Sequence, residues 1–175
     1  TPHLLQSPTA YLKQHPLVQF IEHCPVAQLQ IQHRRIQSVQ TEDGARHSAD
    51  QYVLATGAWS AHWAAQLQLD IPVQPIQGQM ALFKAPAHWL PTMCMNKVMY
   101  LIPRADGHIV CGSSTLQAGF NTAPDAAVQR SILQACFEMV PELEQFPIVQ
   151  QWAGLRPGSP AGVPYIGKMP DLENL

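Results

Sequence analysis

The chain has 175 residues, a formal net charge of −2 at neutral pH and only 13% charged residues. Its 46% hydrophobic content is enough for the core of an ordinary globular protein, which excludes a disordered chain. Ten basic side chains stand against 12 acidic ones and no basic block occurs, so nucleic acid is not an expected partner.

Cysteine and histidine placement gives no support for a metal site. The four cysteines, at positions 24, 94, 111 and 136, form no Cys-x-x-Cys pair, which predicts reduced thiols and a cytoplasmic protein. The eight histidines show no metal-ligand spacing, so no metal is expected. No membrane-spanning run or secretory signal is recognisable, and no membrane partner is expected. A start at Thr1 suggests a piece of a longer protein.

Short elements are predicted in the first 70 residues. Ser7-Pro8 is a helix start and His15-Pro16 an end. The pattern predicts a short helix over 10–14, strands over 17–22, 26–31 and 35–41, a turn at Glu42-Asp43-Gly44, a buried strand over 51–55, and a helix over 60–67. Between the last two, Thr56-Gly57-Ala58 predicts a tight turn. Its glycine would let a ligand approach the backbone, although a plain strand-to-helix connection has the same pattern.

The second half predicts an antiparallel sheet and one well-marked helix. Strands are expected over 73–77, 80–84 and 99–102, and Ala105-Asp106-Gly107 between two apolar runs predicts a β-hairpin from Tyr100 to Gly112. A helix is expected after Asp125, because apolar residues recur there at helical spacing until Pro141. The fold class is therefore α+β.

The segment 152–167 is rich in glycine and proline, which predicts a fixed irregular backbone that presents Arg156. A guanidinium matches a carboxylate bidentately, but an arginine that bridges loop carbonyls or pairs with a nearby acid is an equal alternative. Tyr100 could offer a hydroxyl, although strand tyrosines more often serve packing. Ser113-Ser114-Thr115 lacks the surroundings of a hydrolase nucleophile.

Five segments, taken together and in order, resemble the FAD-dependent amine and D-amino-acid oxidase family, and within it the glycine oxidases. They are Glu22-His-Cys-Pro-Val26, Val53-Leu-Ala-Thr-Gly-Ala-Trp-Ser60, Pro75-Ile-Gln-Gly-Gln79, Tyr100-Leu-Ile-Pro-Arg104, and Trp152-Ala-Gly-Leu-Arg-Pro-Gly-Ser-Pro-Ala-Gly-Val-Pro-Tyr-Ile-Gly167. The resemblance implies part of a Rossmann-like FAD-binding domain over 1–69, a substrate domain with an antiparallel or mixed sheet over 70–151, and a return segment over 152–175.

The resemblance also implies roles for individual residues. Arg156 matches the arginine that binds the substrate carboxylate, and Tyr100 matches a tyrosine of the same pocket. Val26 matches a residue whose backbone meets the adenine end of FAD, and Thr56, Gly57 and Ala58 match a turn close to the cofactor. No side chain is implied as a strong base, so no catalytic residue is assigned. The family's histidine two residues before the tyrosine is replaced here by Val98.

The implied activity is oxidation of the C–N bond of a small amino acid or amine to an imine. FAD would take up the hydride, molecular oxygen would be reduced to hydrogen peroxide, and the imine would serve thiamine synthesis. A homo-oligomer is implied for the full-length protein. The pyrophosphate-binding G-x-G-x-x-G does not occur in the chain, so these 175 residues alone are expected to be inactive and to bind FAD poorly.

Two alternatives remain open at this stage. One is another enzyme of the same superfamily, such as a D-amino-acid dehydrogenase, a sarcosine-type oxidase or an oxidase of a methylaminomethyl group. The other is a non-catalytic binding or scaffold domain that keeps the fold without the reaction.

Overall fold

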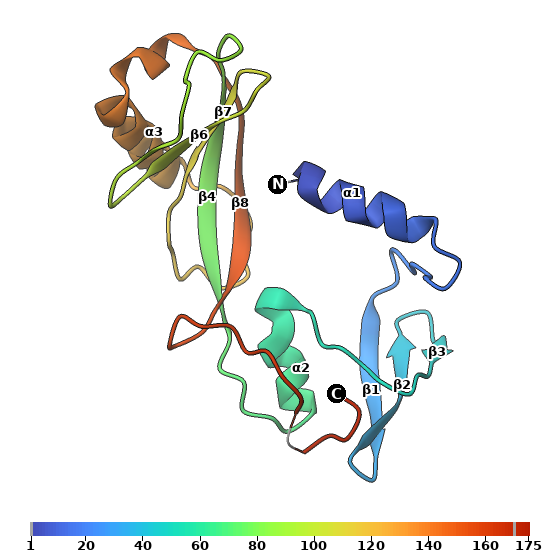
Figure 1. The fold of residues 1–175 in the computed structure, drawn as a ribbon. Helices are drawn as coiled ribbons and strands as arrows, with labels where there is room; N and C mark the ends of the chain where they lie inside the picture. The colour runs from blue at the N-terminus through green and yellow to red at the C-terminus, as the bar shows by residue number, and fades with distance from the viewer. Residues whose placement is uncertain (1, 170) are drawn as a thin grey trace. The chain divides into compact units, whose positions relative to one another are not determined.

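The computed structural model describes residues 2–169 and 171–175. The described elements, drawn in Figure 1, are in chain order α1 (Pro2–Lys13), β1 (Val26–Gln32), β2 (Arg35–Thr41), β3 (Arg46–His47), η1 (Gly57–Trp59), α2 (Ser60–Gln66), β4 (Gln74–Lys84), β5 (Cys94–Met95), β6 (Tyr100–Pro103), β7 (His108–Gly112), α3 (Ala126–Met139), η2 (Pro141–Gln145) and β8 (Ile148–Gly158). They divide into two compact units, residues 1–53 with 166–175, and residues 54–165.

The first unit contains a small antiparallel sheet with the order β1-β2-β3. The C-terminal segment fastens to β2 through Asn174, whose side chain is 1% exposed. Its amide accepts from the Ile36 N–H at 2.9 Å and donates to the Ile36 carbonyl at 2.9 Å. One side chain thus satisfies both backbone groups of a residue more than a hundred positions away, as buried backbone groups require.

The second unit is built on a five-stranded antiparallel sheet with the order β5-β6-β7-β4-β8. The long strands β4 and β8 run side by side over most of their length (Figure 1), with Ile76 opposite Arg156 and Met80 opposite Trp152. The hairpin β6–β7 turns at Asp106-Gly107, where Gly107 has φ +88°. The predictions of an antiparallel sheet and of this hairpin are confirmed.

The core lies between one face of this sheet and α3. Side chains alternate across a strand, so every second residue of β4, β6 and β7 points toward the helix. These residues and their partners on α3 and η2 are fully buried: Ala81, Phe83, Leu101, Ile109, Cys111, Ile132, Cys136 and Leu143. The core of the second unit is therefore the α3-facing side of the sheet.

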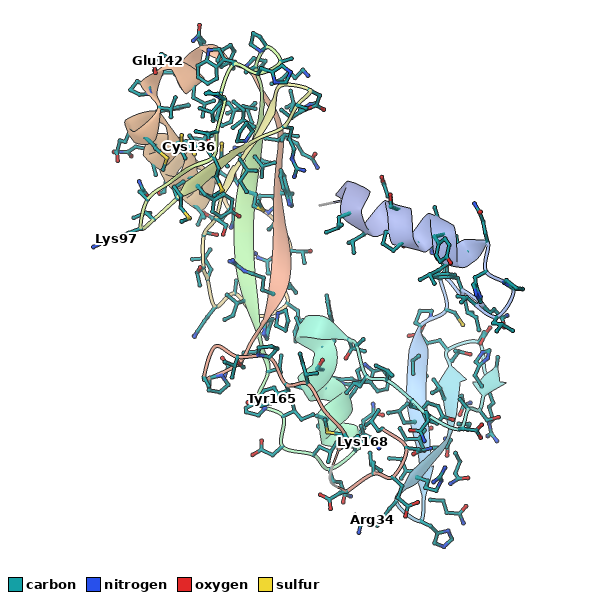
Figure 2. The ribbon with its side chains drawn as sticks, in the orientation of Figure 1. Arg34, Lys97, Cys136, Glu142, Tyr165 and Lys168 are labelled. Atoms are coloured by element: carbon teal, nitrogen blue, oxygen red, sulfur yellow. The ribbon has the colours of Figure 1, made fainter. Side chains whose placement is uncertain are left out.

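Two of the four free cysteines lie in this core, Cys111 from β7 and Cys136 from α3. Cys136 is labelled on α3 in Figure 2. A hydrogen bond with Cys136, together with burial, raises the pKa of the Cys111 thiol far above its ordinary value. Cys111 is therefore a neutral packing residue at physiological pH.

The helix predicted after Asp125 begins there, and Pro141 follows its end. The Asp125 carboxylate accepts from the backbone N–H groups of Ala127 and Val128, each at 2.9 Å. Asp125→Ala leaves both donors without this partner and should lower the free energy of unfolding by about 1 kcal/mol. Urea unfolding of Asp125→Ala and Asp125→Asn measures the loss, and Asn should retain most of the stability. An unchanged midpoint for Asp125→Ala would contradict the capping role.

Two predictions about the first 70 residues are wrong, and a third is wrong at one end. The helix predicted over 10–14 exists as the last part of α1, but α1 begins at Pro2 and passes through Pro8 instead of starting there. The expected strands over 17–22 and 51–55 are irregular, and Leu17 and Val53 are 88% and 89% exposed. An apolar run forms a strand only where a neighbour accepts its backbone hydrogen bonds. Neither run pairs with a strand of the two described sheets, and the single backbone hydrogen bond from the Tyr52 N–H to the Asn174 carbonyl, at 2.8 Å, does not make a ladder.

The irregular backbone predicted for 152–167 is wrong for its first half, because β8 is a regular strand through Pro157 to Gly158, and is confirmed for 159–167, where no helix or strand forms. β8 lies at the edge of the sheet, where a missing N–H is tolerated and proline is compatible with pairing. The predicted strands over 73–77 and 80–84 are likewise one continuous strand, β4. No helix among the residues placed by the structure is long and apolar enough to cross a membrane.

Candidate active site

The face of the sheet opposite α3 carries the two residues singled out for substrate binding. One row of paired residues crosses four strands. Tyr100 of β6 pairs with Gly112 of β7, and Met80 of β4 pairs with both Gly112 and Trp152 of β8. Directly paired residues point to the same side of a sheet, and so do residues two or four positions apart on one strand. Arg156 is four residues from Trp152 on β8, so it shares this face with Tyr100.

The Arg156 side chain lies over the neighbouring strand β4. It crosses Gly78 and reaches the segment that follows β7, where Nη1 donates to Ser113 Oγ at 3.3 Å and Nη2 donates to the Ser114 carbonyl at 2.6 Å. A guanidinium has five N–H donors, so these two contacts leave three that no described residue occupies. Arg156 is also exposed, so that these donors can be reached from solvent.

The Tyr100 hydroxyl lies above Gly112, next to that same segment. A Cβ built on Gly112 would be 3.1 Å from the Tyr100 hydroxyl oxygen and 3.2 Å from Met80 Cγ. Gly112, Ser113 and Ser114 are consecutive, so the hydroxyl lies beside the first residue of a three-residue segment whose other two residues bind the guanidinium. The structure therefore brings Tyr100 and Arg156 to the same face and to the same segment.

The segment after β7 is tied to β4 by hydrogen bonds. The Gln79 N–H donates to Ser114 Oγ at 2.9 Å, and Leu116 exchanges backbone hydrogen bonds with Gln77 at 2.8 and 3.0 Å. On the α3 side, the buried Gln79 amide oxygen accepts from the Asp125 N–H at 3.0 Å and from Gln129 Nε2 at 3.1 Å. These buried amide contacts hold in place the segment that carries the two acceptors of Arg156, the Ser113 hydroxyl and the Ser114 carbonyl.

The turn predicted to lie close to FAD belongs to the same compact unit. Gly57 begins η1 with φ +56°, and no atom lies within 4 Å of the Cβ that it lacks. Thr56 Oγ1 is 3.1 Å from Ser60 Oγ, and Ala58 is 2% exposed, so its side chain serves packing. η1 contacts β4 and β8, the strands that carry Gly78 and Arg156. An exposed glycine turn with open space beside it fits a bulky cofactor against the backbone.

Val26, the other residue predicted to meet FAD, begins β1 in the first unit and is 38% exposed. The cofactor roles of Val26, Thr56, Gly57 and Ala58 remain predictions, as do the substrate roles of Arg156 and Tyr100. Val98, at the position of the family's histidine, is 70% exposed and lies just before β6. Among the residues that the structure describes, no group of three or more metal-ligating side chains occurs.

Sequence reasoning missed Gly78 and did not connect Ser113 or Ser114 with Arg156. The signal for Gly78 was the glycine in Pro75-Ile-Gln-Gly-Gln79, since a glycine within a strand often marks a close approach. The signal for the serines was weaker. Two adjacent hydroxyl residues after a strand do not indicate an arginine 42 or more positions away.

The sequence profile of the FAD-dependent oxidoreductase family, abbreviated DAO, matches residues 4–175. The chain belongs to this family. It is 44% identical over 174 residues to glycine oxidase from Pseudomonas putida, covering 99% of this chain and 47% of that protein. It is 34% identical to hydrogen cyanide synthase subunit HcnC from Pseudomonas aeruginosa, covering 81% of this chain and 34% of that protein.

Solved structures of relatives share the fold. The crystal structure of glycine oxidase from Geobacillus kaustophilus matches with a TM-score of 0.82 and 26% identity, covering 88% of this chain and 41% of that one. Iminodiacetate oxidase from Chelativorans sp. BNC1 matches with a TM-score of 0.78 and 27% identity, covering 83% of this chain and 40% of that one. The family resemblance inferred from five segments is therefore confirmed, and with it FAD as the family's cofactor. The chain covers less than half the length of each of these four relatives, between 34% and 47%.

Proposed function

We propose that the full-length protein oxidises the C–N bond of glycine or a related small amine to an imine, and that Arg156 binds the substrate carboxylate. The observation that carries the proposal is the Arg156 guanidinium on the face opposite α3, with three N–H donors left after its contacts with Ser113 and Ser114. A planar guanidinium binds a carboxylate by two parallel hydrogen bonds, which also fixes the carboxylate's orientation.

FAD, when bound, would accept the hydride released from the α-carbon and pass two electrons to molecular oxygen, which gives hydrogen peroxide. The family membership supports FAD, and the open backbone at Gly57 is where this chain would meet it. Thr56 and Gly57 would contribute backbone groups there, and Val26 would contribute its backbone at the adenine end.

The residues of this chain would act by orientation. When the substrate carboxylate is bound to Arg156, the α-carbon and amine of the substrate would lie farther along the same face. The half-buried Tyr100 lies on this face, beside Gly112. Loss of a hydride from the α-carbon and of a proton from the amine nitrogen gives the imine, which water then hydrolyses. A fixed carboxylate holds one C–H bond toward the acceptor, and such preorganisation removes much of the entropy cost of the reaction.

The test uses the full-length protein with bound FAD. Anaerobic mixing with glycine, sarcosine, D-alanine and L-proline, followed at the flavin absorbance, identifies the substrates that reduce the cofactor. Measuring peroxide after oxygen is admitted separates an oxidase from a dehydrogenase. We expect flavin reduction by glycine or sarcosine and one peroxide per substrate oxidised. No reduction by any amino acid or amine, with FAD bound, would favour the non-catalytic alternative and contradict the proposal.

A further inference from the structure

The Arg156 guanidinium is held from two sides, by the bare backbone of Gly78 below it and by the hydroxyl of Ser113 at its end. We propose that Gly78 and Ser113 are positioning residues for Arg156, which set the height and the rotation of the guanidinium over the sheet. The inference rests on the proposed function, because it assumes that Arg156 binds a carboxylate. It goes further by naming the residues that decide where this carboxylate sits.

Gly78 sets the height of the guanidinium above the backbone of β4. A Cβ built on Gly78 would be 2.6 Å from Arg156 Nη2, 3.0 Å from Cζ and 3.3 Å from Nε, so most of the guanidinium plane lies directly over this Cα. Ordinary contacts to carbon are about 3.5–4.0 Å, so any side chain at position 78 would push the guanidinium away by roughly 1 Å. Glycine at position 78 is therefore what lets the guanidinium lie this close to β4, since the backbone there is ordinary β-strand and does not itself need a glycine.

Ser113 sets the rotation. The Ser114 carbonyl alone holds one end of the guanidinium, at Nη2, and a single contact leaves the plane free to turn about it. The Ser113 hydroxyl binds the other end, at Nη1, and two contacts define the plane. The serine segment itself cannot follow the arginine, because the Gln79 N–H binds Ser114 Oγ and the buried Gln79 side chain binds the start of α3.

The matched control is Gly154. It pairs directly with Gly78 and lies on the same face, but no atom is found within 4 Å of the Cβ that it lacks. An alanine at position 154 therefore introduces the same methyl group into an extended strand without touching Arg156. A difference between the two glycine variants thus reports on the guanidinium and not on strand propensity.

The experiment measures acetate binding by calorimetry, and the KM and kcat for the amino-acid substrate, in the full-length protein with FAD. Gly78→Ala should weaken acetate about tenfold or more and raise KM by a similar factor, because a displacement of about 1 Å misaligns a bidentate pair. Ser113→Ala should weaken acetate binding by a smaller factor, about three to ten. Ser113→Thr keeps the hydroxyl and should bind acetate about as tightly as the wild type. Gly154→Ala should leave acetate affinity within about twofold.

The Arg156→Ala background distinguishes failure of the inference from failure of the proposed function. There, Gly78→Ala and Ser113→Ala should add no further loss of acetate affinity, because the group that they position is gone. If Arg156→Ala itself leaves acetate affinity unchanged, the proposed function fails. If Arg156→Ala weakens acetate but neither Gly78→Ala nor Ser113→Ala does, or if Gly154→Ala weakens it as much as Gly78→Ala, only the positioning inference is overturned.

Discussion

Arg156→Ala should raise the KM for glycine by about 30-fold to a few thousand-fold in the full-length protein, with FAD still bound. Truncation removes a charge-assisted bidentate contact and leaves the substrate carboxylate desolvated without a partner, which costs about 2–5 kcal/mol. The side chain is exposed and its hydrogen-bonding partners, Ser113 and the Ser114 carbonyl, are part-exposed, so the fold should survive its loss. Steady-state kinetics with peroxide detection measures the change.

Arg156→Lys is the informative comparison for this prediction. It keeps the positive charge but loses the planar fork, and its ammonium cannot reach Ser113, Ser114 and a carboxylate with the same geometry. We expect a KM between those of the wild type and Arg156→Ala. The flavin absorbance per protein should be equal in all three, and an unchanged KM in Arg156→Ala would remove the arginine from the substrate site.

Phe83→Ala should lower the free energy of unfolding of the second unit by about 3–5 kcal/mol. Phe83 is 0% exposed near the C-terminal end of β4 and packs edge-to-face on Phe137 of α3, with ring centroids 6.0 Å apart. Removing the ring leaves a cavity between the sheet and the only long helix that covers it among the described residues of this unit. Urea unfolding monitored by circular dichroism measures the loss.

Phe120→Ala serves as the control for Phe83→Ala. Phe120 is 53% exposed on the loop before α3, and its contact is with the Trp59 ring at 5.6 Å. Its removal leaves no closed cavity and should cost no more than about 1.5 kcal/mol. Equal losses for the two variants would contradict the placement of the core on the α3 side of the sheet.

Elements with a strong local signal were predicted correctly from the sequence. The Asp106-Gly107 turn between two apolar runs specifies the hairpin β6–β7, and the helical spacing from Val128 to Met139 specifies α3. Both signals depend only on residues close together in the chain. The antiparallel fold class followed from them.

The failures were elements whose state depends on distant partners. Residues 51–55 are as apolar as a buried strand, but a strand also needs a neighbour, and periodicity does not report one. The whole of 152–167 was predicted to be irregular from its proline and glycine, whereas its first seven residues belong to β8, which pairs with β4 at the sheet edge, where Pro157 is tolerated. Local composition cannot show which strand lies at an edge.

The candidate site was predicted in part. The guanidinium chemistry of Arg156 and the family's order of segments were enough to select Arg156 and Tyr100, which the register of four strands then brings to one face. The roles of Gly78, Ser113 and Ser114 could not be predicted from the sequence. Their contacts with Arg156 depend on β8 lying beside β4 and on the path of the chain after β7, and both are set by long-range pairing.

A crystal structure of the full-length protein with FAD and acetate tests the central claim most directly. We expect the acetate oxygens within hydrogen-bonding distance of the Arg156 guanidinium, the Arg156 contacts with Ser113 and the Ser114 carbonyl retained, and the isoalloxazine ring on the same side of the sheet as Tyr100. Acetate bound elsewhere with Arg156 unoccupied, or a flavin on the α3 side of the sheet, would contradict it.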